Sequence, residues 1–318
     1  MRLLHPSPEE ARIGLRAMKM IASRDGDLSA AARNLLMAAQ RHVLRTDDDL
    51  DALPPIAPEA LAKGFVDPAL REQLVSSMLV LSLTDGPPSP AQLELVRSFA
   101  EALGVRSEAL HDVELLAKRH MLLFYFDFLR RGHIGDMVKQ QYEATGLLGL
   151  VKALLGLRGL LEDRELAARY HALERLPEGT LGHALVRHYR DNGFAFPGER
   201  HGFPEAAVYH DLTHVLSGYG TDPAGELKIG AFIAGYRRTK SIYMLLFVML
   251  TFSAGINLTP LPQPQVVGIL ERPGLADDLL VAIERGGQLN TDLSDHWDFW
   301  PLLPLPVAEA RRSLGLLS

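Results

Sequence analysis

The sequence predicts an all-α protein made of two successive helical parts. Apolar residues recur at helical spacing along most of the 318 residues, and stretches that alternate as strands do are scarce. A helical hairpin occurs twice in the first half, which indicates a small bundle. We therefore expect an N-terminal helical bundle built from a repeated hairpin (residues 1–130), a connecting amphipathic segment (131–162) and a larger α-helical domain (163–318).

The composition excludes several classes of function. The formal net charge is −6 and no long basic block is present, so nucleic-acid binding is not expected. The chain has no cysteine, which excludes disulfides, thiolate metal sites and a cysteine nucleophile, and fits a reducing compartment. The segment Met1–Ala11 lacks the apolar core of a signal peptide, so secretion is not expected.

The hairpin repeat has a constant offset of 60 residues between Met18–Gln40 and Met78–Ala100. Each copy reads as an apolar helix, an Asp-Gly turn, a serine N-cap and a second helix. In the second copy Pro90 and Gln92 follow the serine in the pattern of a capping box. The identical pairs are Met18/Met78, Asp25/Asp85, Gly26/Gly86, Ser29/Ser89, Ala31/Ala91 and Leu35/Leu95.

Acidic residues at these turns have two interpretations. Asp25, Asp27 and Asp85 could collect a cation, but turn-forming and helix-capping roles are favoured. The run Asp47–Asp49 with Asp51 lacks the glycine and distal glutamate of an EF-hand loop, which favours a solvated loop.

The paired Asp-Gly turns resemble those of the TerB-like domain, a module named for tellurite resistance. The resemblance covers about residues 10–105 and extends to the end of the expected N-terminal domain if the following helix belongs to it. It implies a link to membrane-associated stress or assembly systems.

Two apolar segments leave membrane contact open. Gly146–Leu161 carries only Lys152 and Arg158 as charges, which suits either an interfacial membrane helix or a buried helix between domains. Ser241–Leu258 (SIYMLLFVMLTFSAGINL) has no charge and approaches the minimum length of a spanning helix. Its Thr, Ser, Gly and Asn residues favour a core helix over a membrane-docked one or the wall of a lipid tunnel.

The residues typical of a metal site lie in the segment from Tyr209 to Gly230. His210 and His214 are four apart, so on a helix both imidazoles share one face. Asp211 adds an oxygen ligand or a partner for an imidazole. Glu226, early in the next helix, can return to the histidine pair. Asp replaces the Glu of HExxH, which argues against a metalloprotease. His183 and His188 are five apart, and we interpret them as ordinary polar residues.

The motif His210-Asp211-x-x-His214, followed by Glu226, resembles that of the coenzyme-Q-four family of ubiquinone-biosynthesis proteins. The resemblance runs from about Leu166 to Leu316, and it implies that His210, Asp211, His214 and Glu226 bind the metal. Its further landmarks occur in order: Leu176-Pro177-Glu178-Gly179-Thr180-Leu181-Gly182, Pro223-x-Gly225-Glu226, Glu284-Arg285-Gly286, Trp297, Pro306 through Arg311, and Leu314.

Two stretches depart from the family pattern. The charged residues that commonly precede its His-Asp pair are here Ala206-Ala207-Val208-Tyr209. Its Lys-Trp-rich stretch after the glutamate is here the more apolar Leu227–Tyr236. These differences bear on the substrate more than on the metal.

The resemblance implies metal-dependent oxidative decarboxylation of a polyprenylated hydroxybenzoate, with Asp211 and Glu226 as catalytic residues. It also implies partnership with other quinone-biosynthesis proteins, at the inner-membrane surface in the bacterial cytoplasm. Ser241–Leu258, with Leu122–Phe128 or Gly146–Leu161, would line a channel for the prenyl tail. Tyr236 and Tyr243 would face the ring of the prenylated precursor.

Several alternatives stay open. Two imidazoles and two carboxylates suit zinc, the metal expected in purified protein, and also iron, cobalt or manganese. The competing class is a non-catalytic scaffold that binds a long-chain lipid, with a structural or vestigial metal. A related decarboxylase acting on another prenylated or polyketide aromatic is a third option. The oligomeric state is undetermined, a homodimer being one option.

Overall fold

The computed structural model describes residues 2–258 and 266–316. Within these ranges the secondary structure is helical: fifteen α-helices are joined by short 3-10 and π turns, and the only extended pairings are two isolated bridges. The predicted all-α class is confirmed.

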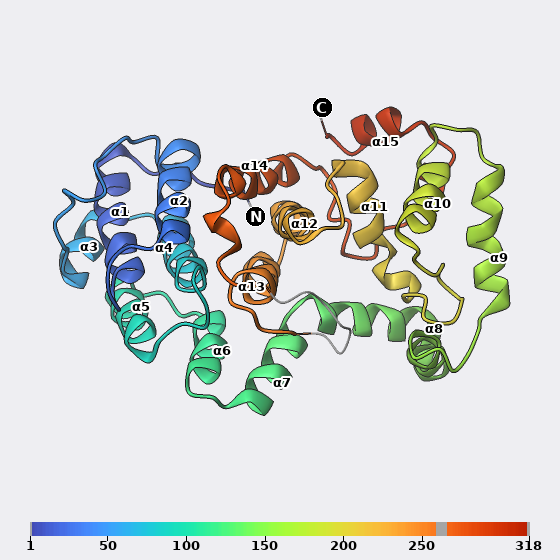
Figure 1. Cartoon of the computed structure of the whole chain (residues 1–318), viewed down its shortest axis with the longest axis horizontal. Coiled ribbons are helices and arrows are strands. Elements are labelled where there is room, and N and C mark those ends of the chain that lie inside the picture. Colours follow the sequence, from blue (N-terminus) through green and yellow to red (C-terminus); the bar gives the residue numbers. More distant parts are fainter. Residues whose placement is uncertain (1, 259–265, 317–318) are drawn as a thin grey trace.

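The N-terminal bundle lies at one end of the molecule (Figure 1). Apolar faces of its helices meet in a core that includes Leu15, Ile21, Leu36, Met78 and Phe99. Its helices are α1 (Pro8–Ala22), α2 (Ala30–Ala39), α3 (Pro58–Gly64), α4 (Pro68–Leu81), α5 (Pro90–Leu103) and α6 (Glu108–Ala117).

The two Asp-Gly turns lie against each other. Ser29 and Ser89 cap α2 and α5 through their side-chain oxygens, and Gln92 completes a capping box. The Ser29 hydroxyl donates to Asp85 across the turns at 2.8 Å. In the part of the chain that the structure describes, none of the aspartates of these turns joins a group that could hold a metal. Asp85 therefore links the two turns.

The connecting segment is helical almost throughout. α7 (Met121–Arg131) is followed directly by α8 (His133–Leu157), and only Gly132 lies between them. α8 bends at Gly146, whose backbone is non-helical (φ 68°, ψ −174°). No residue of α8 is buried, so Gly146–Leu161 is not a buried inter-domain helix.

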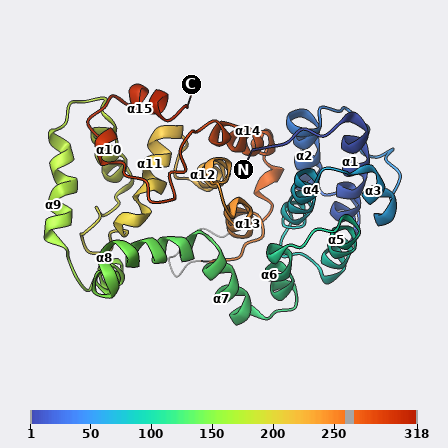
Figure 2. The same ribbon diagram turned by 180° about the vertical axis from the view of Figure 1, so that it is seen from behind.

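The second half is built around α12, which is surrounded by α11, α13 and α14 (Figure 2). Ten of the fourteen residues of α12 are buried. The helices of this half are α9 (Arg164–Ala172), α10 (Leu181–Asn192), α11 (Val208–Ser217), α12 (Pro223–Tyr236), α13 (Ser241–Phe252), α14 (Leu275–Gly287) and α15 (Val307–Ser313).

Glycines allow α12 and α14 to cross closely. A β-carbon on Gly286 would lie 2.0 Å from the carbonyl oxygen of Phe232, and one on Gly235 would lie 2.3 Å from that of Ile283. Backbone atoms therefore touch where side chains would otherwise separate the helices.

α13 is a core helix. It packs against α12 and α4, and nine of its twelve residues are buried. Among the described residues, no helix has both the length and the apolar character needed to cross a membrane. Ser241–Phe252 thus matches the core-helix interpretation. The remainder of the Ser241–Leu258 segment lies outside the helix.

The two halves share one hydrophobic core. α14 packs on α2 and on the π turn that follows it (Gln40–Leu44), where Arg41 forms a two-pronged ion pair with Asp277 at 2.9 and 2.8 Å. An apolar cavity of about 100 Å³ remains between them, lined by α4 and α13 residues among others. That volume is well below the roughly 300–1,000 Å³ of small-molecule pockets. A larger cavity of about 630 Å³ lies beside α8 and is lined by Gly149, Lys152, Gly156 and Leu161 among others.

Substituting Gly286→Ala should destabilise the protein. The new methyl would meet backbone rather than a movable side chain, so we expect a loss of about 2–4 kcal/mol in the free energy of unfolding, measured by urea denaturation. Gly156→Ala is the matched control, because its β-carbon would meet only one atom, at 3.7 Å, in the exposed α8. Equal stability of the two variants would contradict the close crossing.

Candidate metal centre

The turn between α11 and α12 places the candidate ligands. α11 ends at Gly218, which adopts the left-handed conformation (φ 79°) that glycine accommodates without strain. Asp222 then caps α12, with Pro223 in the first position. The chain reverses, and Glu226 in the first turn of α12 faces back to α11, as the sequence predicted.

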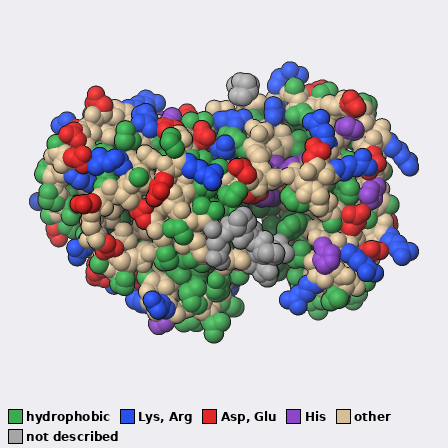
Figure 3. Space-filling model, in the orientation of Figure 1, with side chains coloured by type: hydrophobic (Ala, Val, Ile, Leu, Met, Phe, Trp, Pro, Cys, Tyr) green, Lys and Arg blue, Asp and Glu red, His purple; other side chains and the backbone are tan. Residues whose placement is uncertain are grey.

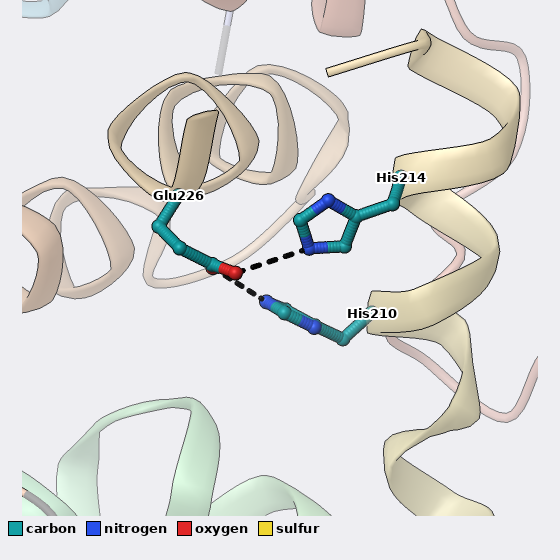
Figure 4. A group of neighbouring side chains, drawn as sticks. All are labelled: His210, His214 and Glu226. Carbon is teal, nitrogen blue, oxygen red and sulfur yellow. Dashed lines mark ion pairs between the residues drawn. The ribbon is translucent and has the colours of Figure 1, made fainter. Parts of the chain in front are cut away.

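Three side chains converge on one point (Figure 4). The Nε2 atom of His210 lies 3.4 Å from one oxygen of Glu226, and that of His214 lies 3.4 Å from the other. All three ligand atoms are within 4.8 Å of one another. Two ligands at about 2.1 Å from a tetrahedral ion are themselves about 3.4 Å apart. The spacing therefore fits a shared divalent ion.

The group is buried on one side and open on the other. The His214 side chain is 2% exposed, that of Glu226 25% and that of His210 39%. An ion held here would meet protein on the His214 side and be reachable beside His210. Such an arrangement leaves a coordination position for an exogenous ligand, as catalytic sites require.

Asp211 stands apart from the three-residue group. One of its oxygens accepts a hydrogen bond from the Tyr189 hydroxyl at 2.6 Å. The other lies 3.7 Å from Nδ1 of His210 and 3.7 Å from Nε2 of His188. Of the two roles the sequence left open, this position matches a partner of an imidazole rather than a ligand.

The orientation of His214 is set by backbone. Its Nδ1 lies 3.1 Å from the carbonyl oxygen of Tyr219, an acceptor only, so Nδ1 carries the proton. Nε2 is then the atom that faces Glu226, and it can bind a metal ion once it carries no proton. Arg285 holds Tyr219 in place by donating to its hydroxyl at 2.7 Å.

Charge is balanced within the cluster. Burial acts to lower the pKa of His210, but the carboxylates of Asp211 and Glu226 outweigh it and raise this pKa to about 10. Burial acts to raise the pKa of Glu226, yet His210 and His214 lower it to about 2. The pKa of Asp211 is likewise held below its usual range, by His188 and His210 against the effect of burial. The metal-free cluster therefore holds a proton on His210 and carboxylates ready to bind a cation.

The two tyrosines expected at the substrate ring have protein partners. Tyr236 is fully buried in α12, and its hydroxyl lies 3.2 Å from that of Thr213. Tyr243 donates to Asp112 at 2.9 Å, beside Arg131. These contacts fix both rings in the core.

Sequence reasoning missed three residues around the site: His188 and Tyr189 of α10, and Tyr219. His188 was set aside because it shares no helix face with His183, and no periodicity links α10 to α11. The neighbouring pair His188-Tyr189 carries no signal of its own without the fold.

The landmark segments of the second half also come together. Backbone amides of Leu181 and Gly182 donate to the carbonyls of Leu305 and Leu303, and Arg311 donates to the Leu216 carbonyl at the end of α11. Comparison with known proteins gives no match, either to a family model or to a curated protein.

Metal affinity should depend steeply on pH. With a folded-state pKa of about 10, His210 carries a proton below that pH, and an incoming ion must displace it. The apparent Kd for Zn²⁺ should therefore fall about tenfold per pH unit between about pH 7 and 8.5. Competition with a chromophoric chelator measures it. An affinity that levels off above pH 7, as for a histidine of ordinary pKa, would contradict the charge balance.

Proposed function

We propose that this protein binds one divalent metal ion through His210, His214 and Glu226 and acts in ubiquinone biosynthesis. Its reaction would be the oxidative decarboxylation of a polyprenylated hydroxybenzoate. The observation that carries the proposal is the convergence of the three side chains at ion-sharing distances beside an open face. The ordered landmarks of the coenzyme-Q-four resemblance supply the substrate class.

The donor set suits several metals. Two imidazoles and one carboxylate bind zinc, iron(II), cobalt or manganese. Zinc is the metal we expect in purified protein. When bound, the ion would supply Lewis acidity toward an anionic oxygen of the substrate.

The chain's own residues divide the remaining tasks. Glu226 neutralises charge at the open face, where 25% of its side chain is exposed. The carboxylate of Asp211 lies 3.7 Å from Nδ1 of His210 and keeps that ring in place. His214 anchors the site on the buried side. The half-exposed face of His210 is where the aromatic acid would approach.

The proposed reaction balances with dioxygen as oxidant. The bond between the ring carbon and the carboxylate breaks, carbon dioxide leaves, and the ring carbon becomes bonded to oxygen. Two aromatic acids and one dioxygen give two phenols and two molecules of carbon dioxide. Each ring loses two electrons and dioxygen gains four.

An exposed apolar face on α7 and α8 supports action at a membrane surface. Figure 3 shows hydrophobic side chains gathered over α7 and the far end of α8. Between Thr145 and Leu161 the only charges are basic, which suits anionic lipid. The exposed residues are Leu122, Leu123, Phe126, Val138, Tyr142, Leu147, Leu148, Val151, Leu154, Leu155, Leu160 and Leu161.

On this proposal the protein is peripheral to the bacterial inner membrane and works with other quinone-biosynthesis proteins. The prenyl tail would stay in the bilayer beneath α8, since α13 is enclosed in the core. The TerB-like half would serve recruitment, fused to the second half through α14.

A non-catalytic lipid-binding scaffold is the second candidate. The exposed face of α8 favours it, because its exposed apolar side chains are open to contact with a lipid. The open side of the metal group favours the enzyme.

Glu226→Gln separates the two. For an enzyme we expect turnover of a polyprenylated hydroxybenzoate, followed by mass spectrometry, to fall more than about 100-fold, because a ligand matters more than its supporting residues. Glu59→Gln, an exposed change on α3, is the control. A folded Glu226→Gln protein that restores quinone levels in cells lacking the wild type would instead establish the scaffold.

Leu148→Asp should weaken membrane binding. Leu148 is 74% exposed on α8, and losing its insertion while adding an acid should lower partitioning onto vesicles of anionic phospholipid at least about tenfold. Vesicle co-sedimentation measures this. Val66→Asp makes the same change at a 77% exposed site between α3 and α4. Equal partitioning of both variants would exclude the α8 face as the membrane contact.

A further inference from the structure

A layer of α10 side chains backs the metal-binding group. His188 and Tyr189 are adjacent in this helix, and both reach Asp211 of α11. The His188 ring stacks on that of His214, with centroids 5.1 Å apart and planes 26° from parallel. α10 thus touches the group through a ligand and through the carboxylate behind another ligand.

We propose that His188 is a positioning residue of the metal centre: with Tyr189 it holds Asp211 behind His210, so that Asp211 orients His210 instead of coordinating the ion. The proposal rests on the metal binding proposed above. It differs from the family resemblance, which counts Asp211 among the ligands.

The first support is the way Asp211 is occupied. The carboxylate is 11% exposed, and a buried carboxylate needs donors. Tyr189 supplies one at 2.6 Å. The remaining oxygen faces two imidazole nitrogens at equal distances of 3.7 Å.

The second support is an incomplete hydrogen bond. Nε2 of His188 is the one buried side-chain nitrogen or oxygen without a hydrogen-bond partner among the described residues. Native structures rarely leave such an atom unpaired unless it has a function. The nearest carboxylate oxygen is that of Asp211, and a shift of about 0.5 Å would bring it within hydrogen-bond range.

The geometry gives His188 a different role in the metal-free and in the metal-loaded protein. In the metal-free protein Nε2 of His188 makes no hydrogen bond within the described residues, so it contributes little polar stabilisation. When His210 binds the ion, its Nε2 must face the ion and its Nδ1–H must face Asp211. Asp211 then needs its own support, which His188 is placed to provide.

The test uses the full chain, freed of metal and titrated with Co²⁺, whose visible bands report coordination number. His188→Phe keeps the ring that stacks on His214 but removes the nitrogen. We expect its Kd for Co²⁺ to rise about 10- to 100-fold, as for other residues that orient ligands, while the intensity of the visible bands stays unchanged. The urea midpoint of the metal-free protein should stay equal or rise.

Four further variants sharpen the result. His188→Gln, whose amide nitrogen can take the place of Nε2, should recover affinity to within about threefold of wild type. Tyr189→Phe should weaken Co²⁺ binding without changing the bands, and Asp211→Asn should do the same. His183→Phe, at a partly exposed site on the same helix, is the control and should bind as wild type.

Two outcomes would overturn the inference. One is a result that marks His188 as a packing residue. Such a result would be wild-type Co²⁺ affinity in His188→Phe, or a loss of metal-free stability in both His188→Phe and His188→Gln. The other is a change of coordination number in Asp211→Asn, which would make Asp211 a ligand. Failure of the wild-type protein to bind Co²⁺ would instead refute the proposed metal site itself.

Discussion

The close crossing of α12 and α14 is the constraint on which the rest of the structure depends. Gly235 and Gly286 let the two backbones touch, and this contact puts Arg285 beside the end of α11. Arg285 holds Tyr219, whose carbonyl orients His214, while α12 itself carries Glu226. A steric requirement of two glycines is thereby linked to the geometry of the candidate metal-binding group on α11 and α12.

The same crossing joins the halves of the molecule. α14 presents one side to α12 and another to α2, where the ion pair of Arg41 and Asp277 closes the contact. The N-terminal bundle is therefore part of one core rather than a tethered module. α7 buries Phe124 and Phe128 in this core and exposes Leu122, Leu123 and Phe126, whereas α8 runs along the outside with no buried residue. On the proposed function, these exposed apolar side chains and the open face of the candidate metal group would serve a substrate that stays in the membrane.

Features encoded locally could be predicted from the sequence. The i, i+4 histidine pair, the Gly218 stop and the Asp222-Pro223 start lie within one short segment, so the return of Glu226 followed from helix geometry. Features that depend on packing could not. His188 joins the site only because α10 lies on α11, and none of the described neighbours of α8 buries any of its residues. Tyr236 and Tyr243 were expected at the substrate ring, but buried partners on other helices hold both hydroxyls.

The central claim is that His210, His214 and Glu226 hold one divalent ion. Elemental analysis of full-length protein purified without a chelating resin, beside His214→Ala prepared identically, tests it most directly. The account predicts about one metal ion per wild-type chain. It predicts a metal content at least about tenfold lower in the variant, because one of the three ligands is lost. Wild-type protein without metal that also takes up none on dialysis against Zn²⁺, or equal content in both proteins, would contradict it.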